Sequence, residues 1–360
     1  MTPIFDAHLD LAWNALQWDR DLTLPLEVLR QAESPLSDHR ARGRAMLSLP
    51  ELRRGGVAVC LATVLVRSRP NVAPAAPTRR DLDHRNQTHA SAVGLGQLAY
   101  YQLLERQGHI RLIRTRRELD QHWMNWSTAP QQEPLGVIVA MEGADPITGP
   151  EQVPQWREQG LRCVGLAHYG ASVYACGTGA QGSITERGRA LIVALRDNGM
   201  ILDLTHCAEP GFFEALDLFD GPVHASHNMC RALVPGDRQF SDEQLRRLIE
   251  RGAVIGMALD AWMLKPGWVV GQTSRQEVSL AAVADHVDHI CQLAGSVRHV
   301  GIGSDLDGGF GSEQCPRELE SIADLQQLGS VLCSRGYGDD DVKSIFHGNW
   351  LRFFSAALPA

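Results

Sequence analysis

Short apolar runs alternate with longer amphipathic stretches along most of the chain. A short continuous apolar run is typical of a buried strand, whereas an apolar residue at every third or fourth position is typical of a helix. Eight runs predict strands, at residues 3–9, 56–63, 135–142, 161–168, 200–206, 222–227, 253–259 and 300–305. Among the segments between them, helices are predicted at residues 81–107, 186–198, 241–251 and 278–294.

Eight strands separated by helix-length segments predict a closed parallel (β/α)8 barrel of the TIM type, which is an α/β fold. A doubly wound open sheet is the alternative, but it usually has fewer strands and a Gly-x-Gly-x-x-Gly loop after the first strand. No such loop follows residues 3–9. We therefore expect one catalytic barrel domain over residues 1–360, with an inserted helical and loop stretch at about 64–134. Prolines within this stretch predict a loop at residues 68–80.

Polar residues stand at the ends of most of these predicted strands. They are His8, Asp10, Glu142, His168, His206, His227 and Asp305. In a (β/α)8 barrel the carboxyl ends of all strands open onto one face, where active sites lie. Any one of these residues alone could be a helix cap or a core residue. Imidazole and carboxylate groups that converge on one face instead favour a divalent metal such as zinc.

The number of these candidates exceeds the needs of one zinc ion. A catalytic zinc usually takes three protein ligands, so seven candidates fit two metals and one further group. Two metals about 3.5–4 Å apart commonly share a bridging carboxylate and a bridging hydroxide. Related two-metal barrels often use a carbamylated lysine as the bridge, but the only lysines here are Lys265 and Lys343. Neither follows a predicted strand directly, so Glu142 is the expected bridge.

Composition and charge exclude several classes of partner. Apolar residues make up 44% and charged residues 21%, and the net charge of −8 gives no footprint for nucleic acid or an anionic membrane. No apolar run reaches the ~18 residues of a membrane span, and the first motif begins too early to leave room for a signal peptide. The eight cysteines form no Cys-x-x-Cys pair. We expect a cytoplasmic protein with reduced thiols, and the sequence leaves room for a homodimer.

Seven short motifs stand in a fixed order along the chain. They are Asp6-Ala7-His8-Leu9-Asp10, Glu142-Gly143, Leu166-Ala167-His168, Leu204-Thr205-His206, Ser226-His227, Asp237-Arg238 and Gly303-Ser304-Asp305. In order and spacing, this set resembles the membrane (renal-type) dipeptidases, a zinc metallopeptidase family of the amidohydrolase-like barrels. The resemblance covers almost the whole chain. It implies a two-zinc dipeptidase that cleaves small dipeptides with a free C-terminal carboxylate through a metal-bridging hydroxide.

The resemblance also implies a role for each residue. His8, Asp10 and Asp305 would bind one zinc, His206 and His227 the other, and Glu142 would bridge the two. His168 would contact the scissile carbonyl and its oxyanion, Asp305 would handle the proton of the attacking hydroxide, and Arg238 would bind the substrate carboxylate, for which a planar guanidinium is suited.

Several alternatives remain open at this point. The same site would serve a metal-dependent amide or lactam hydrolase, and a catalytically silent barrel could act as a binding protein. Arg238 could instead be a surface residue paired with Asp237 or Asp242. The family's side-chain pockets differ here, where Tyr174 and Trp262 are expected nearby, so the preferred dipeptide is not set by the resemblance.

Overall fold

A ring of eight parallel strands forms the centre of the computed structural model, which describes residues 1–69 and 79–360. In spatial order the strands are β1 (Ile4–Leu9), β2 (Val57–Leu65), β6 (Leu135–Glu142), β7 (Leu161–Gly165), β8 (Ile201–Asp203), β9 (Val223–Asn228), β10 (Ile255–Met257) and β11 (Val300–Ile302). The pairing of β11 with β1 and of β2 with β6 closes the ring. The predicted (β/α)8 barrel is therefore confirmed, and the open doubly wound sheet is excluded.

Several strands are shorter than the apolar runs that predicted them. The prediction placed His168, His206 and Asp305 at the last residues of strands, but all three lie in loops, three residues beyond β7, β8 and β11. The backbone explains two of these errors, because φ is +63° at His206 and +56° at Asp305. A left-handed residue cannot continue a strand, so the chain turns there and aims these side chains across the barrel mouth.

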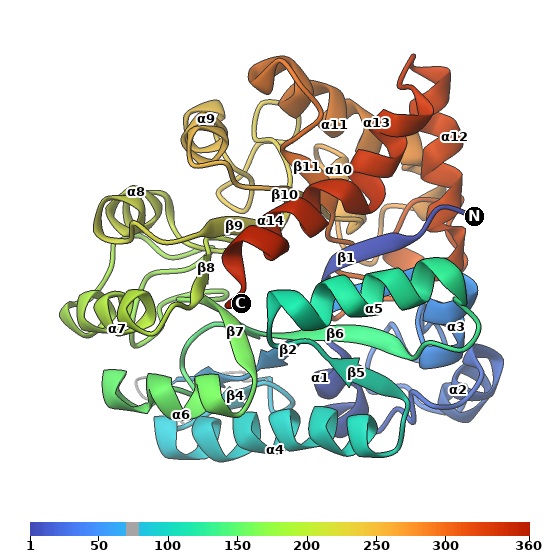
Figure 1. Cartoon of the computed structure of the whole chain (residues 1–360). Coiled ribbons are helices and arrows are strands. Elements are labelled where there is room, and N and C mark those ends of the chain that lie inside the picture. Colours follow the sequence, from blue (N-terminus) through green and yellow to red (C-terminus); the bar gives the residue numbers. More distant parts are fainter. Residues whose placement is uncertain (70–78) are drawn as a thin grey trace.

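Helices surround the barrel, as Figure 1 shows. The outer helices include α4 (Gln87–Arg106), α6 (Val153–Glu158), α7 (Glu186–Asp197), α8 (Glu209–Leu218), α9 (Asp242–Glu250), α11 (Leu280–Ala294) and α12 (Gln326–Ser334). The helix predicted at 81–107 begins six residues late, because Asn86 caps it by accepting a hydrogen bond from His89 N at 2.9 Å. The other three predicted helices lie within about two residues of α7, α9 and α11.

Shorter elements complete the described chain. They are the helices α1 (Leu11–Gln17), α2 (Leu26–Glu33), α3 (Leu49–Arg54), α10 (Ala261–Leu264) and α13 (Asp339–Lys343), and the short turns Pro150–Gln152, Arg275–Glu277, Ser312–Gln314, Ile322–Leu325 and Ser344–Gly348. No helix within residues 1–69 or 79–360 has both the length and the hydropathy needed to cross a membrane.

The connection between β2 and β6 is the longest in the barrel. It contains β3 (Arg67–Ser68), β4 (Asp83–His84), α4, β5 (Ile110–Leu112) and α5 (Arg116–Thr128). Strand β5 pairs with the first residues of β6 and adds a ninth strand beside the ring. Most of the loop predicted at 68–80 lies outside the described residues.

One end of the barrel is closed by the C-terminal helix α14 (Asn349–Ala357), which crosses the strands beside α5 in Figure 1. Its Trp350 is fully buried and donates Nε1–H to Ile302 O at 2.9 Å, and Phe354 stacks on Phe5 at 5.2 Å. Because Phe5 lies at the start of β1, α14 seals the N-terminal ends of the strands. The carboxyl ends, which carry the candidate ligands, form the opposite face.

Candidate metal centre

All seven candidate ligands converge at the carboxyl ends of the strands. Their donor atoms form three overlapping groups, each within 4.8 Å: His8, Glu142 and His227; Glu142, His168 and His206; and His8, Asp10 and Asp305. Most of these side chains are buried, whereas Asp305 and His168 are 14% and 12% exposed. The cluster is therefore closed to solvent except on the side of Asp305 and His168, which we call its open edge.

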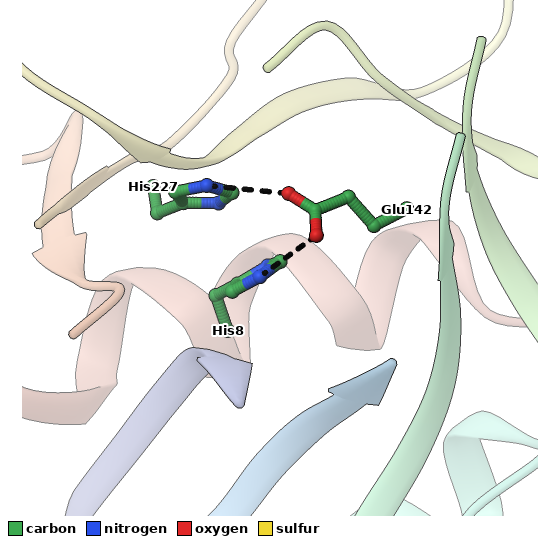
Figure 2. A group of neighbouring side chains, drawn as sticks. All are labelled: His8, Glu142 and His227. Carbon is green, nitrogen blue, oxygen red and sulfur yellow. Dashed lines mark ion pairs between the residues drawn. The ribbon is translucent and has the colours of Figure 1, made fainter. Parts of the chain in front are cut away.

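The Glu142 carboxylate faces both His8 and His227, and Figure 2 shows one of its oxygens directed to each ring. Its Oε1 is 3.2 Å from His206 Nε2 and 3.4 Å from His227 Nε2. Its Oε2 is 3.6 Å from His8 Nε2. The two oxygens thus face different histidines, which is the arrangement that a carboxylate shared by two metal ions requires.

Two further carboxylates, those of Asp10 and Asp305, lie beside His8. Its Nε2 is 3.6 Å from Asp10 Oδ1 and 3.8 Å from Asp305 Oδ1, and it has no hydrogen-bond partner in the described part of the chain. Asp10 in turn accepts a hydrogen bond from the Thr63 hydroxyl. A buried polar nitrogen left free amid carboxylate oxygens is the feature expected of a metal ligand.

Hydroxyl groups on the far side of the imidazoles set their orientation. Ser226 Oγ is 3.0 Å from His227 Nδ1 and 3.4 Å from His8 Nδ1, and Thr178 Oγ1 is 2.9 Å from His206 Nδ1. When each Nδ1–H donates to its hydroxyl, the Nε2 lone pair points into the cluster. This neutral tautomer is the form that zinc binds. Against the effect of burial, Glu142, Asp10 and Asp305 raise the pKa of His8 to about 10, so His8 would release a proton on binding a metal.

Asp203 links the loop that carries His206 to the strand β9 that carries His227. Its Oδ1 accepts hydrogen bonds from Thr205 N at 3.0 Å and from Ser226 N at 3.1 Å, directly before His206 and His227. This support is needed because His206 holds a left-handed backbone conformation that costs free energy in a non-glycine residue.

The electrostatics of the cluster favour added positive charge. Burial would raise the pKa of Glu142, but His168 and His8 hold that pKa well below its usual range. Burial raises the pKa of Asp10 to about 6 and that of Asp305 well above its usual range. Among the described residues, no lysine or arginine forms an ion pair with these three carboxylates. Divalent cations would supply the missing charge, so the donor set fits zinc.

A pocket above the cluster contains the remaining candidates. His168 Nε2 is 3.9 Å from Glu142 Oε1, and Arg238 forms part of the wall with Trp262. Arg238 is 2% exposed and donates Nη2–H to His227 O at 3.0 Å, while its Nη1 has no partner among the described residues. The Arg238 guanidinium therefore offers a free N–H edge to a ligand.

The surface alternative for Arg238 is wrong. Asp237 accepts a hydrogen bond from Gly179 N at 2.7 Å, and Asp242 lies 2.7 Å from His289, so neither pairs with Arg238. Segment 235–240 places Arg238 in the pocket wall, buried beside the candidate ligand His227.

Two expectations about the pocket wall have opposite outcomes. Trp262 lines the pocket as expected. Tyr174 does not, because its side chain is buried elsewhere and its hydroxyl donates to Ile147 O. Both lysines are remote, with Lys265 paired to Glu277 and Lys343 to Asp340.

The sequence interpretation missed three polar residues at this face. Thr63 is the polar residue that ends the apolar run 56–63, and Asp260 directly follows the run 253–259. Both could therefore have been identified from their positions at predicted strand ends. Thr178 lies ten residues beyond His168, and nothing in the sequence pattern marks it. Only the folded loop brings it to His206.

Comparisons with known proteins point to one family. The sequence profile described as "Membrane dipeptidase (Peptidase family M19)" matches residues 1–358. Dipeptidase aclJ of Aspergillus oryzae is 30% identical over 223 residues, which cover 61% of this chain and 50% of that protein. An uncharacterized dipeptidase of Schizosaccharomyces pombe is 27% identical over 223 residues, 61% of this chain and 52% of that protein. The match thus spans about half the length of these relatives.

Solved structures resemble the fold along its full length. The crystal structure of dipeptidase AC, a metallopeptidase of family M19, has a TM-score of 0.80 and 25% identity, covering 100% of this chain and 99% of that one. A metallopeptidase from Rhodobacter sphaeroides, solved with a phosphinate mimic of the dipeptide L-Ala-D-Ala, has a TM-score of 0.78 and 24% identity, covering 99% of both chains.

Proposed function

The chain belongs to the membrane dipeptidase family, peptidase family M19, and from this premise we propose that it is a zinc-dependent dipeptidase. Its proposed substrates are small dipeptides with a free C-terminal carboxylate. The observation that carries the proposal is the convergence of seven histidine and carboxylate side chains around Glu142, below a pocket that Arg238 lines.

The ligand assignment is the one that the family resemblance implies, and one of the three donor groups coincides with its first zinc. His8, Asp10 and Asp305 would hold one zinc, His206 and His227 the other, and Glu142 would contact both. When bound, the two ions supply Lewis acidity, which lowers the pKa of water and polarises a carbonyl. The hydroxyls of Ser226 and Thr178 support this assignment, because they leave Nε2 of all three histidines free for metal.

Two side chains at the open edge would act on the reacting atoms. Burial lowers the pKa of His168 well below its usual range, and a ring N–H is present in the neutral as well as in the charged imidazole. His168 would direct that N–H to the carbonyl oxygen as negative charge develops on it. The Asp305 carboxylate would take the proton that the attacking water gives up.

Arg238 would select substrates by their C-terminal carboxylate. Its guanidinium is held by His227 O on one side, and its Nη1 hydrogens on the other side have no partner among the described residues. A carboxylate that binds there gains charge-assisted hydrogen bonds inside a mostly buried site, where such pairs are strong. A capped amide lacks that charge, so the pocket favours a dipeptidase over a general amide hydrolase.

A screen of dipeptides and their C-terminal amides, with zinc restored, tests the function. We expect hydrolysis of free dipeptides and weak turnover of the matching amides. Equal rates on both would indicate a general amide hydrolase instead. No hydrolysis by a chain that holds two zinc ions would indicate a binding protein.

The broader assignments rest on the sequence. We assign residues 1–360 to one catalytic domain, in which residues 64–134 are an insertion. The cytoplasmic location, the lack of nucleic-acid and membrane partners, and a homodimer stay predictions.

A further inference from the structure

The hydroxyl of Ser226 lies between one candidate ligand of each proposed metal position. Its Oγ is 3.0 Å from His227 Nδ1 and 3.4 Å from His8 Nδ1. In the proposed assignment His8 binds the first zinc and His227 binds the second. One hydroxyl oxygen therefore contacts the imidazoles of both metal positions.

Two other hydroxyls at the cluster each contact a single candidate ligand. Thr63 donates to Asp10, which belongs to the first position, and Thr178 Oγ1 is 2.9 Å from His206 Nδ1 in the second. Among the described residues outside the ligand set, only Ser226 forms side-chain hydrogen bonds with a ligand of each position. The chain thus provides one shared hydroxyl and one hydroxyl specific to each position.

The backbone around Ser226 is closely packed. Ser226 lies on β9 and is 1% exposed, and its N–H donates to Asp203 Oδ1 at 3.1 Å. A side chain at Gly256 on β10 or at Gly303 just beyond β11 would collide with Ser226 O. Glycine at both positions lets the neighbouring strands approach this carbonyl. The Ser226 hydroxyl is therefore held on a rigid part of the barrel, as preorganisation of a ligand requires.

The hydrogen-bonding capacity of Ser226 matches its three neighbours. A serine hydroxyl has one O–H to donate and two lone pairs that accept. Its third neighbour is Thr205 Oγ1, at 3.3 Å. All three contacts are satisfied when His8 and His227 each donate Nδ1–H to Ser226 Oγ and the Ser226 O–H is donated to Thr205. In this arrangement Nε2 of both imidazoles is left for a metal.

The competing tautomer of each imidazole carries its proton on Nε2 and cannot bind a metal there. Carboxylate oxygens of Glu142 face these Nε2 atoms, at 3.4 Å for His227 and 3.6 Å for His8. Without the Ser226 oxygen, each Nδ1–H would be buried without an acceptor, which is costly. Removal of one hydroxyl would therefore disfavour the metal-binding tautomer in both rings.

We propose that Ser226 is a positioning residue shared by the two metal positions, because its single hydroxyl keeps Nε2 of both His8 and His227 available to zinc. Loss of this oxygen should weaken the binding of both zinc ions. Loss of the Thr63 or the Thr178 hydroxyl should weaken one. The inference rests on the proposed function, because it needs the two metal positions of that function.

Zinc affinity tests the proposal without any use of turnover. The metal-free wild type, Ser226→Ala and the matched controls Thr63→Val and Thr178→Val are equilibrated with chelator-buffered zinc, and the zinc bound per chain is measured. Loss of a group that orients a metal ligand weakens metal binding by roughly 10–100-fold. We expect both zinc dissociation constants to rise by this factor in Ser226→Ala, and one of the two to rise in each control.

Proton NMR of the imidazole N–H groups at saturating zinc separates positioning from a packing defect. A hydrogen-bonded imidazole N–H gives a signal far downfield. Ser226→Ala should move the Nδ1–H signals of His8 and His227 upfield and leave that of His206 in place. Thr178→Val should move the His206 signal alone, because its hydroxyl contacts only that ring.

Three results would overturn the inference: weakening of only one zinc in Ser226→Ala, equal weakening of both in either control, or an unmoved His8 signal in Ser226→Ala. None of them would affect the proposed function if the zinc-loaded wild type hydrolyses dipeptides. A wild type that binds two zinc ions without hydrolysing dipeptides would refute the function and leave the role of Ser226 standing. A wild type that binds no zinc would refute both.

Discussion

Histidines at the two ends of the barrel have opposite surroundings. At the carboxyl ends, His8, His206 and His227 lie 3.2–3.6 Å from the Glu142 carboxylate and have hydroxyl partners behind them. At the N-terminal ends, His224 lies 5.6–5.9 Å from three aromatic rings of α14, and neither ring nitrogen has a partner among the described residues. Burial lowers the pKa of His224, so it serves there as a neutral packing group.

The backbone differs between the ends in the same way. Left-handed φ values occur at His206 and Asp305 on the ligand face, where loops hold side chains at a cost in free energy. At the sealed end, regular packing of α14 against Phe5 stabilises the barrel. Stability and chemistry are therefore divided between the two ends, so substitutions at each end should affect different measurements.

The largest effect on activity is expected at Glu142. Glu142→Ala removes the carboxylate whose two oxygens face His8 and His206. We therefore predict loss of at least one zinc and of nearly all turnover. The fold should remain, because the apolar residues of β6 are unchanged. Metal analysis, circular dichroism and dipeptide hydrolysis check this, with Glu142→Gln as the variant that keeps the shape. Two bound zincs and a near-normal rate would make Glu142 a structural residue.

A smaller loss is expected at His168, which stands at the open edge of the cluster. If it stabilises the oxyanion, His168→Ala should retain both zincs and lower kcat by roughly 10²–10³. Zinc content and steady-state kinetics measured on one preparation separate the possibilities. Loss of zinc from this variant would instead identify His168 as a ligand.

Arg238 should affect one substrate class more than the other. Arg238→Ala removes a charge-assisted pair, so we predict a fall in kcat/KM of roughly 30-fold or more for a free dipeptide. The corresponding dipeptide amide has no carboxylate to lose and should change little. Equal losses on the two substrates, or no loss on either, would refute the assigned role.

The sealed end should show the reverse pattern. Trp350→Ala removes a fully buried ring and its hydrogen bond to Ile302 O, which should destabilise the fold by about 3–5 kcal/mol. The kcat/KM of the folded, zinc-loaded fraction should stay within about twofold. Trp350→Phe is the milder control. A large fall in kcat/KM with an unchanged melting temperature would contradict the division between the ends.

The ligand face was predictable because its residues follow apolar runs. His8, Glu142 and His227 lie within strands, and the barrel brings the strand ends together whatever the loops do. The geometry of the loops was harder to predict from the sequence. Tyr174 is near His168 in sequence, yet its loop turns it toward Ile147. Thr178, farther along the same loop, reaches His206. Such placements depend on hydrogen bonds between loops, which no periodic pattern encodes.

Zinc titration of the stripped protein tests the central claim most directly. After chelation and verified removal of metal, dipeptide hydrolysis should fall to background. Added zinc should restore it and reach a plateau at about two ions per chain, because the proposed ligand assignment gives two metal positions that share Glu142. Full hydrolysis by the metal-free protein would contradict the account, as would a plateau at two zinc ions with no hydrolysis of any dipeptide.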